Sequence, residues 1–430
     1  MLAETRHIPC LMTPLGEAIG VRGRGENVMS DFHQASVITT LHKLGGPNIE
    51  SLEAELEQIT AIRPVALVLP CLFSELETPA MPRIAEELLQ VGYLREIVVA
   101  LARANEEQFA KAQKFFSALP QRTTLIWIDG SRVQGLLREM EEKGLTVGPD
   151  GKGRSVWLAY GYLLGRAECD VIALHDGDIL SYHRELLARL VYPVANPRLG
   201  FEFCKGYYSR VTDRLHGRAA CLLVTPLIRA LQRMVGHQPF LAFMDAFRYP
   251  LAGEVAMSAD LARINRIPGD WGLEVGVLAE VYRNVSSWRV CQSDLSDAYE
   301  HKHQGLSAED PRKGLMRMAL DITKSMLRTL AEEGVPISDG LLKSLPVTYL
   351  RSAREVMARY QDDAIINSLT FDQHQEDQAV EAFARAVRHA SDEYLADPVG
   401  TSLIPNWNRV LAATPDIFDR LIAAVEKDNA

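Results

Sequence analysis

Two aspartates that directly follow a short apolar run are the residues of this sequence best suited to chemistry. Residues 171–174 have the composition of a buried strand, and Asp176 and Asp178 come next with Gly177 between them. Alternate residues of an extended segment point the same way, so both carboxylates can face one site. Two hard oxygen ligands at the end of a strand suit Mg²⁺ or Mn²⁺. The other interpretation is a solvated acidic turn, because Asp-x-Asp is a short pattern.

Two further stretches carry candidate ligands. Lys152 lies between two glycines in front of an expected helix, and small residues, a helix N-terminus and a lysine together suit a phosphate group. The alternative is a flexible lysine loop. The stretch Glu300-His301-Lys302-His303-Gln304 can add a histidine to a Mg²⁺ or Mn²⁺ site, or it can be a polar surface segment.

Carboxylates and basic residues also occur close to glycines farther along the chain. Glu254 and Glu274 each follow a glycine within two positions, which suits a carboxylate that accepts sugar hydroxyls at close range. Both are equally typical of the first turn of a helix. Lys205 and Arg218 are basic residues on glycine-containing stretches, and an arginine there can bind an anionic acceptor with two hydrogen bonds. The alternative is a pair of basic surface sites.

The elements that must position these residues alternate between strands and helices. We expect strands at 65–69, 96–101, 124–128 and 171–174, and helices at 50–61, 80–91, 105–117 and 155–166. Near-continuous apolar strands alternating with helices predict an α/β fold whose mostly parallel sheet is covered on both faces. In such sheets ligands bind outside the carboxyl ends of the strands. Pro70, residues 101–103 and Asp176 should therefore line one crevice.

Length and composition are those of an ordinary globular protein. The 430 residues suffice for two or three domains, and 47% of them are hydrophobic and 24% charged. The net charge of −10, with no long run of Lys or Arg, argues against binding to nucleic acid. No apolar run approaches the roughly 20 residues of a membrane span. The six scattered cysteines fit reduced thiols, so we expect a cytoplasmic protein.

Taken together and in this order, the motifs resemble the glucosyl-3-phosphoglycerate synthase family of retaining GT-A glycosyltransferases, with the mannosyl-3-phosphoglycerate synthases as more distant relatives. Eight stretches between residues 64 and 304 carry the resemblance: Leu69-Pro70-Cys71-Leu72 with Glu75, Gly151-Lys152-Gly153, Asp176-x-Asp178, Lys205-Gly206-Tyr207-Tyr208, Gly217-Arg218, Pro250-Leu251-Ala252-Gly253-Glu254, Gly272-Leu273-Glu274-Val275-Gly276 and Glu300-His301-Lys302-His303. The resemblance implies a GT-A, Rossmann-like fold and a homodimer. It also implies metal-dependent transfer of glucose or mannose from a nucleoside-diphosphate sugar to 3-phosphoglycerate, which makes a compatible-solute precursor.

The resemblance assigns donor-side roles to residues of this chain. Leu69, Pro70 and Glu75 match the segment that holds the nucleoside. Lys152 matches a lysine that contacts the nucleotide, and Asp176 lies on the sugar-nucleotide side. The family more often has Asn-Glu where this chain has Phe-Ser at positions 73 and 74, so the preference for uridine or guanosine stays open.

The metal, sugar and acceptor roles follow in the same way. Asp178 and His301 match the residues that bind Mg²⁺ or Mn²⁺, and Glu274 matches the acid that holds the donor sugar hydroxyls. We therefore take Asp178, Glu274 and Lys152 as the catalytic set. The acceptor residues implied by the resemblance are Gly217, Arg218 and His303. The family's acceptor loop continues with a threonine where this chain has an alanine at position 220.

The resemblance implies same-face attack on the sugar, with the leaving phosphate helping to take the acceptor proton and with no covalent sugar adduct on Glu274. Two other enzyme functions stay open: a GT-A transferase with another small acceptor such as glycerate, and a nucleotidyltransferase. A binding protein without activity is a further alternative, against which the retained acids and His301 argue.

We expect three parts in the chain. Residues 1–50 form an N-terminal extension, and residues 51–305 form the GT-A domain, with a nucleotide-sugar half at about 64–180 and an acceptor half at about 181–305. Residues 306–430 form a helical C-terminal region, because glycine becomes sparse there and apolar residues recur with helical spacing.

Overall fold

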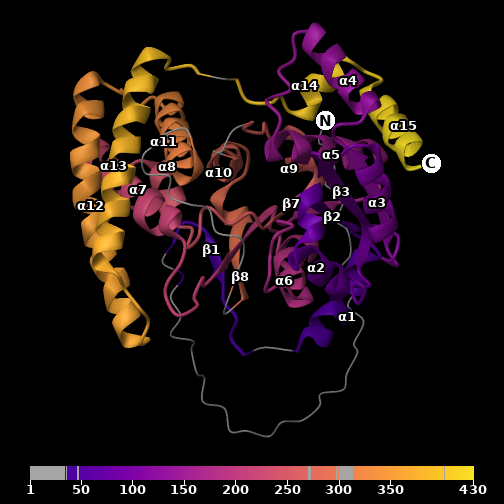
Figure 1. The fold of residues 1–430 in the computed structure, drawn as a ribbon, viewed down its shortest axis with the longest axis horizontal. Coiled ribbons are helices and arrows are strands. Elements are labelled where there is room, and N and C mark those ends of the chain that lie inside the picture. The colour runs from indigo at the N-terminus through magenta and orange to yellow at the C-terminus, as the bar shows by residue number, and fades with distance from the viewer. Residues whose placement is uncertain are drawn as a thin grey trace, which may run out of the picture. The chain divides into compact units, whose positions relative to one another are not determined.

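An eight-stranded sheet forms the centre of the protein (Figure 1). The computed structural model describes residue 34 and residues 36–45, 48–269, 273–296, 299, 313–400 and 402–430. In sheet order the strands are β1 (Thr39–Leu41), β8 (Val290–Ser296), β6 (Phe203–Tyr208), β7 (Val255–Ser258), β5 (Val171–Leu174), β2 (Val65–Leu72), β3 (Leu94–Ala102) and β4 (Arg122–Trp127). β7 is antiparallel to both neighbours and the other pairs are parallel, so the predicted mostly parallel sheet is confirmed.

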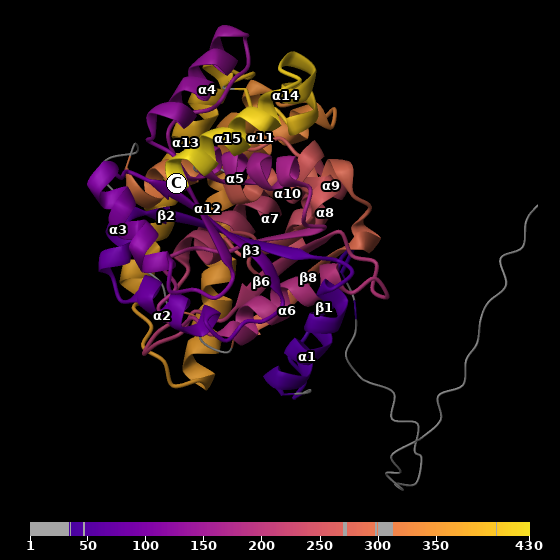
Figure 2. The same cartoon turned by 90° about the vertical axis from the view of Figure 1, so that its right-hand side faces the viewer.

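Helices cover both faces of this sheet (Figures 1 and 2). One face carries α1 (Ile49–Thr60), α2 (Ala80–Leu88), α3 (Glu106–Phe116) and α6 (Arg184–Ala195), and the other carries α5 (Lys152–Arg166), α9 (Ala259–Ile264) and α10 (Leu273–Asn284). Along β2, Leu67 and Leu69 pack on the first face, and Ala66 and Val68 pack on the second. Successive side chains of a strand point to opposite faces, so an unbroken apolar strand is stable only between two helical layers.

The elements expected between residues 50 and 180 are present with small shifts at their ends. β5 matches the expected strand, and α5 begins at Lys152, three residues earlier than expected. The sequence analysis missed α4 (Ser131–Glu142), although its buried residues have helical spacing. These buried residues are Val133, Leu136, Leu137 and Met140.

The helical C-terminal region is also present. It contains α11 (Gly314–Glu332), α12 (Asp339–Ile366), α13 (Gln373–Ala396), α14 (Trp407–Ala413) and α15 (Ile417–Asn429). α13 packs against α11 and α12, and α12 packs against α7 (Thr225–Val235). α15 instead returns to the other side of the protein and packs against α4, α5 and β4 (Figure 1). Within the described residues, no helix is long and apolar enough to cross a membrane.

The N-terminal segment is not wholly irregular where the structure describes it. β1 lies within the predicted extension 1–50 and pairs in parallel with β8 at the edge of the sheet. Residues Ser36–Ala430 form one compact unit. The predicted boundaries at 50 and 305 fall inside this unit and stay predictions.

Candidate active site

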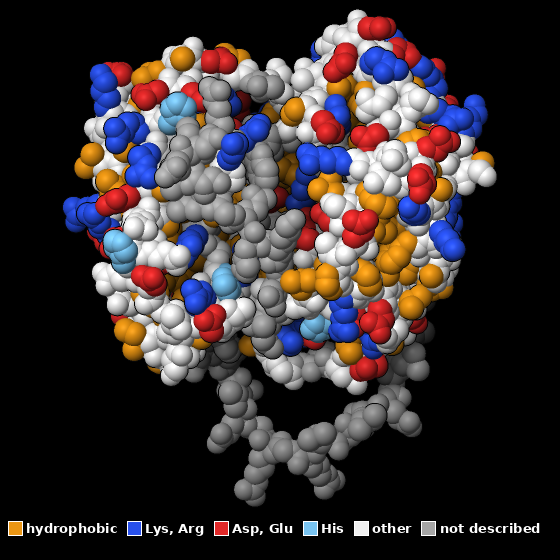
Figure 3. All heavy atoms as spheres, in the orientation of Figure 1, with side chains coloured by type: hydrophobic (Ala, Val, Ile, Leu, Met, Phe, Trp, Pro, Cys, Tyr) orange, Lys and Arg blue, Asp and Glu red, His pale blue; other side chains and the backbone are white. Residues whose placement is uncertain are grey.

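A pocket of about 970 Å³ opens at the carboxyl ends of the strands. Its walls include the ends of β2, β3 and β5, the first residues of α5 and α10, and the segment 214–219. Pro70, Ala102, Arg103 and Asp176 all line it, as the sequence analysis predicted for these strand ends. Figure 3 shows a hollow at the centre of this face, with Lys and Arg side chains at its rim. The volume suits an organic ligand of the size of a nucleotide sugar.

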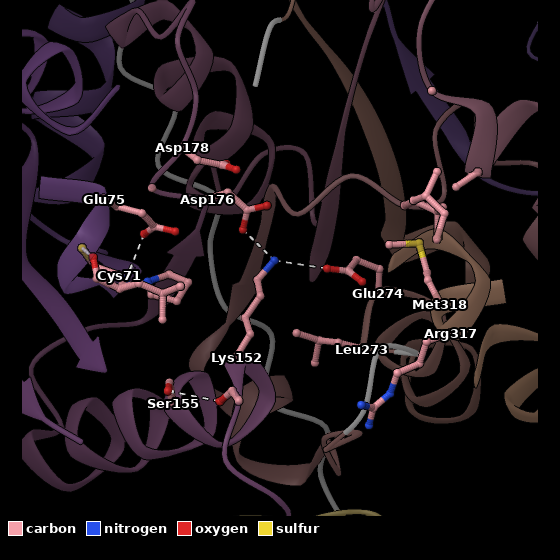
Figure 4. A pocket seen from close by; sticks show the side chains of 18 of the residues that line it. Cys71, Glu75, Lys152, Ser155, Asp176, Asp178, Leu273, Glu274, Arg317 and Met318 are labelled. Carbon is pink, nitrogen blue, oxygen red and sulfur yellow. Dashed lines mark hydrogen bonds and ion pairs between the residues drawn. The ribbon is translucent and has the colours of Figure 1, made fainter. Parts of the chain in front are cut away.

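Three carboxylates form one wall of the pocket. Asp176 and Asp178 follow β5, and Glu75 comes from the short helix η1 (Phe73–Glu77) after β2 (Figure 4). The backbone N–H of Leu72 donates a hydrogen bond of 3.0 Å to Glu75 Oε2. Burial, together with the negative charge of Asp176, raises the pKa of Asp178 to about 6. Burial also raises the pKa of Glu75 to about 7, and the two aspartates add to this effect.

Glycines allow these carboxylates to lie against the backbone. A Cβ atom on Gly253 would lie 2.5 Å from Asp176 Oδ2, and a Cβ atom on Gly177 would lie 3.1 Å from Glu75 Oε2. A larger residue at Gly253 would displace the Asp176 carboxylate, whereas at Gly177 it would press mainly on Met81, whose Cε atom would lie 2.9 Å away. The close approach that the sequence analysis inferred at Gly177 is therefore made by groups of the chain itself.

Lys152 is the first residue of α5 and links both sides of the pocket (Figure 4). Its Nζ atom lies 2.6 Å from Asp176 Oδ1 and 3.1 Å from Glu274 Oε1. Burial alone lowers the pKa of Lys152, but the two carboxylates outweigh burial and raise it. The lysine is therefore charged at neutral pH. The structure thus brings together three of the residues that the sequence analysis placed on the donor side, although 122 residues separate Lys152 from Glu274.

The two acids near glycines have different surroundings. Glu274 lies in the first turn of α10 and lines the pocket. Glu254 is fully buried and accepts hydrogen bonds from the hydroxyls of Tyr208 at 2.8 Å and Tyr299 at 2.6 Å. Nearby, the buried ammonium of Lys205 donates a hydrogen bond of 2.6 Å to the carbonyl of residue 252, and burial lowers the pKa of this lysine to about 8.

The opposite side of the pocket is rich in basic side chains. Arg210, Arg214, His216 and Arg218 all line it, and Gly217 lies between the last two. Gly217 has a φ of +97°, in the region that favours glycine, so this residue type fits the turn before Arg218. A pocket with acids on one side and arginines on the other can hold a cation and an anion together.

The C-terminal helices also contribute to the pocket. Arg317 and Met318 reach it from α11 (Figure 4), as does Leu315, and Gln375 reaches it from α13. The sequence shows Leu315 and Met318 only as part of an apolar helical stripe. Nothing in the stripe distinguishes residues facing a pocket from residues facing the core.

One expected donor-binding residue does not line the pocket. The Leu69 side chain is fully buried in the core, whereas Leu72 lines the pocket. Leu69 therefore contributes to the strand and not to the lining. His301 and His303 lie outside the described residues.

Asp176 and Asp178 fit a divalent cation by their chemistry. They are hard oxygen ligands at a strand end, and no side-chain hydrogen bond to Asp178 occurs within the described part of the chain. A cation would offset the effect of burial that raises the pKa of Asp178. The described residues contain no group of three or more His, Cys, Asp or Glu side chains placed to hold a metal. Water, substrate oxygens or residues beyond the described ones would supply the further ligands.

Comparison with known proteins gives the family. No protein-family model matches the sequence. The glucosyl-3-phosphoglycerate synthase of Persephonella marina is 49% identical over 402 residues, which cover 94% of this chain and 100% of that protein. The enzyme of the same name from Methanococcoides burtonii is 39% identical and covers 93% and 98% of the two chains.

Solved structures support the fold. Glucosyl-3-phosphoglycerate synthase from Mycobacterium tuberculosis, in complex with phosphoglyceric acid, aligns with a TM-score of 0.50 at 22% identity, covering 70% of this chain and 90% of the other. The same enzyme in complex with Mn²⁺, UDP-glucose and phosphoglyceric acid also gives 0.50, at 23% identity. These similarities confirm the predicted fold, and the identity to the Persephonella and Methanococcoides proteins confirms the predicted relationship. The chain belongs to the glucosyl-3-phosphoglycerate synthase family.

Proposed function

We propose that this chain transfers glucose from a nucleoside-diphosphate glucose to 3-phosphoglycerate with the help of Mg²⁺ or Mn²⁺. The observation that carries the proposal is the division of charge in one pocket. Asp176 and Asp178 lie at a strand end beside Lys152 of α5, and arginines 210, 214 and 218 lie across from them. The product is a glucosyl-3-phosphoglycerate.

The donor is assigned to the side of the pocket formed by the strand ends. Pro70, Glu75, Lys152 and Asp176 line this side, and the lysine already lies against carboxylates at the start of a helix. A diphosphate would exchange those carboxylates for its own oxygens, a change that keeps the ammonium paired. A helix N-terminus adds to the attraction for phosphate. UDP-glucose is the donor bound by the mycobacterial relative.

Glu274 is proposed to orient the donor sugar by accepting hydrogen bonds from its hydroxyls. The carboxylate lies 3.1 Å from the Lys152 ammonium, on the donor side of the pocket. When bound at Asp178, a divalent cation supplies positive charge that offsets the charge of the departing diphosphate. Lys152 adds a second, fixed positive charge on the same group. The acceptor anion is assigned to Gly217 and Arg218.

Release of nucleoside diphosphate tests this proposal. UDP- and GDP-glucose and the corresponding mannose donors are each supplied with Mg²⁺ or Mn²⁺, and with 3-phosphoglycerate, glycerate or no acceptor. Release that requires metal, a glucose donor and 3-phosphoglycerate is expected, and Asp178→Asn should abolish it. Faster release with glycerate would refute the acceptor. Full activity of Asp178→Asn would refute the metal site.

The family and the pocket both bear on the other functions considered from the sequence. Membership of a glucosyltransferase family disfavours a nucleotidyltransferase. No observation in the pocket favours glycerate over 3-phosphoglycerate, because the basic side of the pocket suits a phosphorylated acceptor. The cytoplasmic location and the homodimer stay predictions.

A further inference from the structure

The first turn of α13 lies against the basic side of the pocket. Asp372 caps this helix by accepting a hydrogen bond of 3.0 Å from the backbone N–H of Gln375. The backbone N–H of Thr370, just before the helix, donates a hydrogen bond of 2.8 Å to the carbonyl of Asp213. The C-terminal region is therefore attached to the loop that carries the arginines.

Glu376, in the same turn, holds the guanidinium group of Arg218. Arg218 Nε lies 2.9 Å and 3.0 Å from the two carboxylate oxygens of Glu376, and Nη2 lies 2.7 Å from Oε1. Nη2 also donates a hydrogen bond of 2.7 Å to Oε1 of Gln375. The donors on the Nε–Nη2 edge of the guanidinium are thus hydrogen-bonded to side chains of α13.

The other edge of the same guanidinium remains available. Among the described residues, Nη1 of Arg218 has no hydrogen-bond partner. The Arg218 side chain is 30% exposed and that of Glu376 is 15% exposed, so the contact is largely shielded while the arginine still reaches the pocket. An arginine held by one planar edge presents the rest of its donors in a fixed orientation.

Fixing the Arg218 side chain before the acceptor arrives lowers the entropic cost of acceptor binding. A free arginine side chain loses substantial rotamer freedom when a ligand orders it. Here Glu376 and Gln375 have already ordered it, and the start of α13 stabilises the acidic side chain. The cost of ordering therefore falls on folding and not on acceptor binding.

We propose that Glu376 is a positioning residue for the acceptor. It fixes Arg218 so that Nη1 faces the anionic group of 3-phosphoglycerate, and it makes the C-terminal helical region part of acceptor recognition. This inference rests on the proposed function, in which Arg218 binds that anionic group. It goes beyond that function by giving α13 a role that no motif in the sequence indicates.

The test uses steady-state kinetics of the full chain, with 3-phosphoglycerate and the glucose donor varied separately. Glu376→Ala should raise the KM for 3-phosphoglycerate roughly tenfold or more, the effect of freeing an arginine side chain. The KM for the donor should not change. Glu376→Gln keeps one acceptor oxygen and should give a smaller rise. An unchanged KM for 3-phosphoglycerate in Glu376→Ala would overturn the proposal, because the carboxylate would then have no role in acceptor binding. A lower KM would also overturn it, because the carboxylate would then compete with the acceptor for Arg218.

A matched control separates positioning from general stabilisation. Glu355 on α12 pairs with Arg233 on α7, so it also joins the C-terminal helices to the rest of the protein, but neither residue lines the pocket. Glu355→Ala should leave both KM values unchanged. If it raises the KM for 3-phosphoglycerate as much as Glu376→Ala does, the effect is structural and the proposal fails.

A double variant distinguishes failure of this inference from failure of the proposed function. In an Arg218→Ala background, Glu376→Ala should add no further rise in the KM for 3-phosphoglycerate. If Arg218→Ala raises this KM but Glu376→Ala does not, the acceptor site stands and the positioning role is refuted. If Arg218→Ala leaves it unchanged, the assignment of Arg218 to the acceptor fails, and with it the inference.

Discussion

Trp407 on α14 connects the end of the chain to the helix that begins with Lys152. Its ring stacks on Trp157 of α5 with centroids 4.4 Å apart, and its Nε1–H donates a hydrogen bond of 3.1 Å to the Trp157 carbonyl. The ring packs directly against the backbone at Gly161, where an added Cβ atom would lie 2.0 Å from Cζ2 of Trp407. Trp407 is only 1% exposed. We predict that this contact is a major source of stability.

The cost of Trp407→Ala follows from these contacts. A buried tryptophan removes about 150–250 Å² from water, and at about 25 cal/mol per Å² the hydrophobic contribution is roughly 4–6 kcal/mol. The realistic unfolded chain already buries part of that area, which lowers the estimate. Stacking adds about 0.5–1.5 kcal/mol. We expect a loss of about 4 kcal/mol in the free energy of unfolding, within the range found for buried Trp→Ala changes.

Urea unfolding followed by far-UV circular dichroism measures this loss without relying on the fluorescence of the deleted ring. Trp288→Ala is the matched control, because Trp288 is 86% exposed and the same atoms are removed. It should change the free energy of unfolding by no more than about 0.5 kcal/mol. A loss below about 2 kcal/mol in Trp407→Ala would refute the reasoning, because the ring would then contribute no more than a partly exposed side chain.

Two further predictions concern the acidic wall. Gly253→Ala places a methyl group 2.5 Å from Asp176 Oδ2, so the rate of nucleoside diphosphate release should fall more than about tenfold. Gly135→Ala is the control, because open space surrounds Gly135, and it should be as active as the parent. Equal activity of both variants would contradict the packing argument. Burial lowers the pKa of His175 from 6.5 to about 4. Between these pH values the folded protein therefore binds fewer protons than the unfolded chain. The free energy of unfolding should fall by up to about 3 kcal/mol as the pH falls through this window. His175→Gln should remove that loss, and urea unfolding of both proteins at pH 7 and pH 4 measures the difference; identical pH dependence would exclude this residue as the cause.

The sequence alone determined the type of sheet and the edge at which the site lies. Unbroken apolar strands such as 65–72 are stable only when covered on both faces, and this follows from the alternation of side chains along a strand. The carboxyl ends of parallel strands meet at one edge, so Pro70 and Asp176 could be placed in one pocket from their positions after apolar runs. Local chemistry also marked Lys152 at the start of a helix.

Individual side chains at the strand ends were less predictable. Leu69 and Leu72 are both leucines in one strand, yet the first is buried in the core and the second lines the pocket. A motif identifies the segment, but the strand's length and twist decide which residue is the last to face the core. β2 runs to Leu72, three residues beyond the predicted end, so the last residues of the strand themselves line the pocket.

Only the tertiary structure decided which distant residues meet. Arg218 and Glu376 are 158 positions apart, and Trp157 and Trp407 are 250 positions apart, yet each pair is in direct contact. An amphipathic helix shows that it has an apolar face but does not specify the surface that face will cover. That choice depends on loop lengths and on shape complementarity between whole elements. The sequence therefore placed the acidic side of the pocket, and only the packing of the C-terminal helices revealed what holds the basic side.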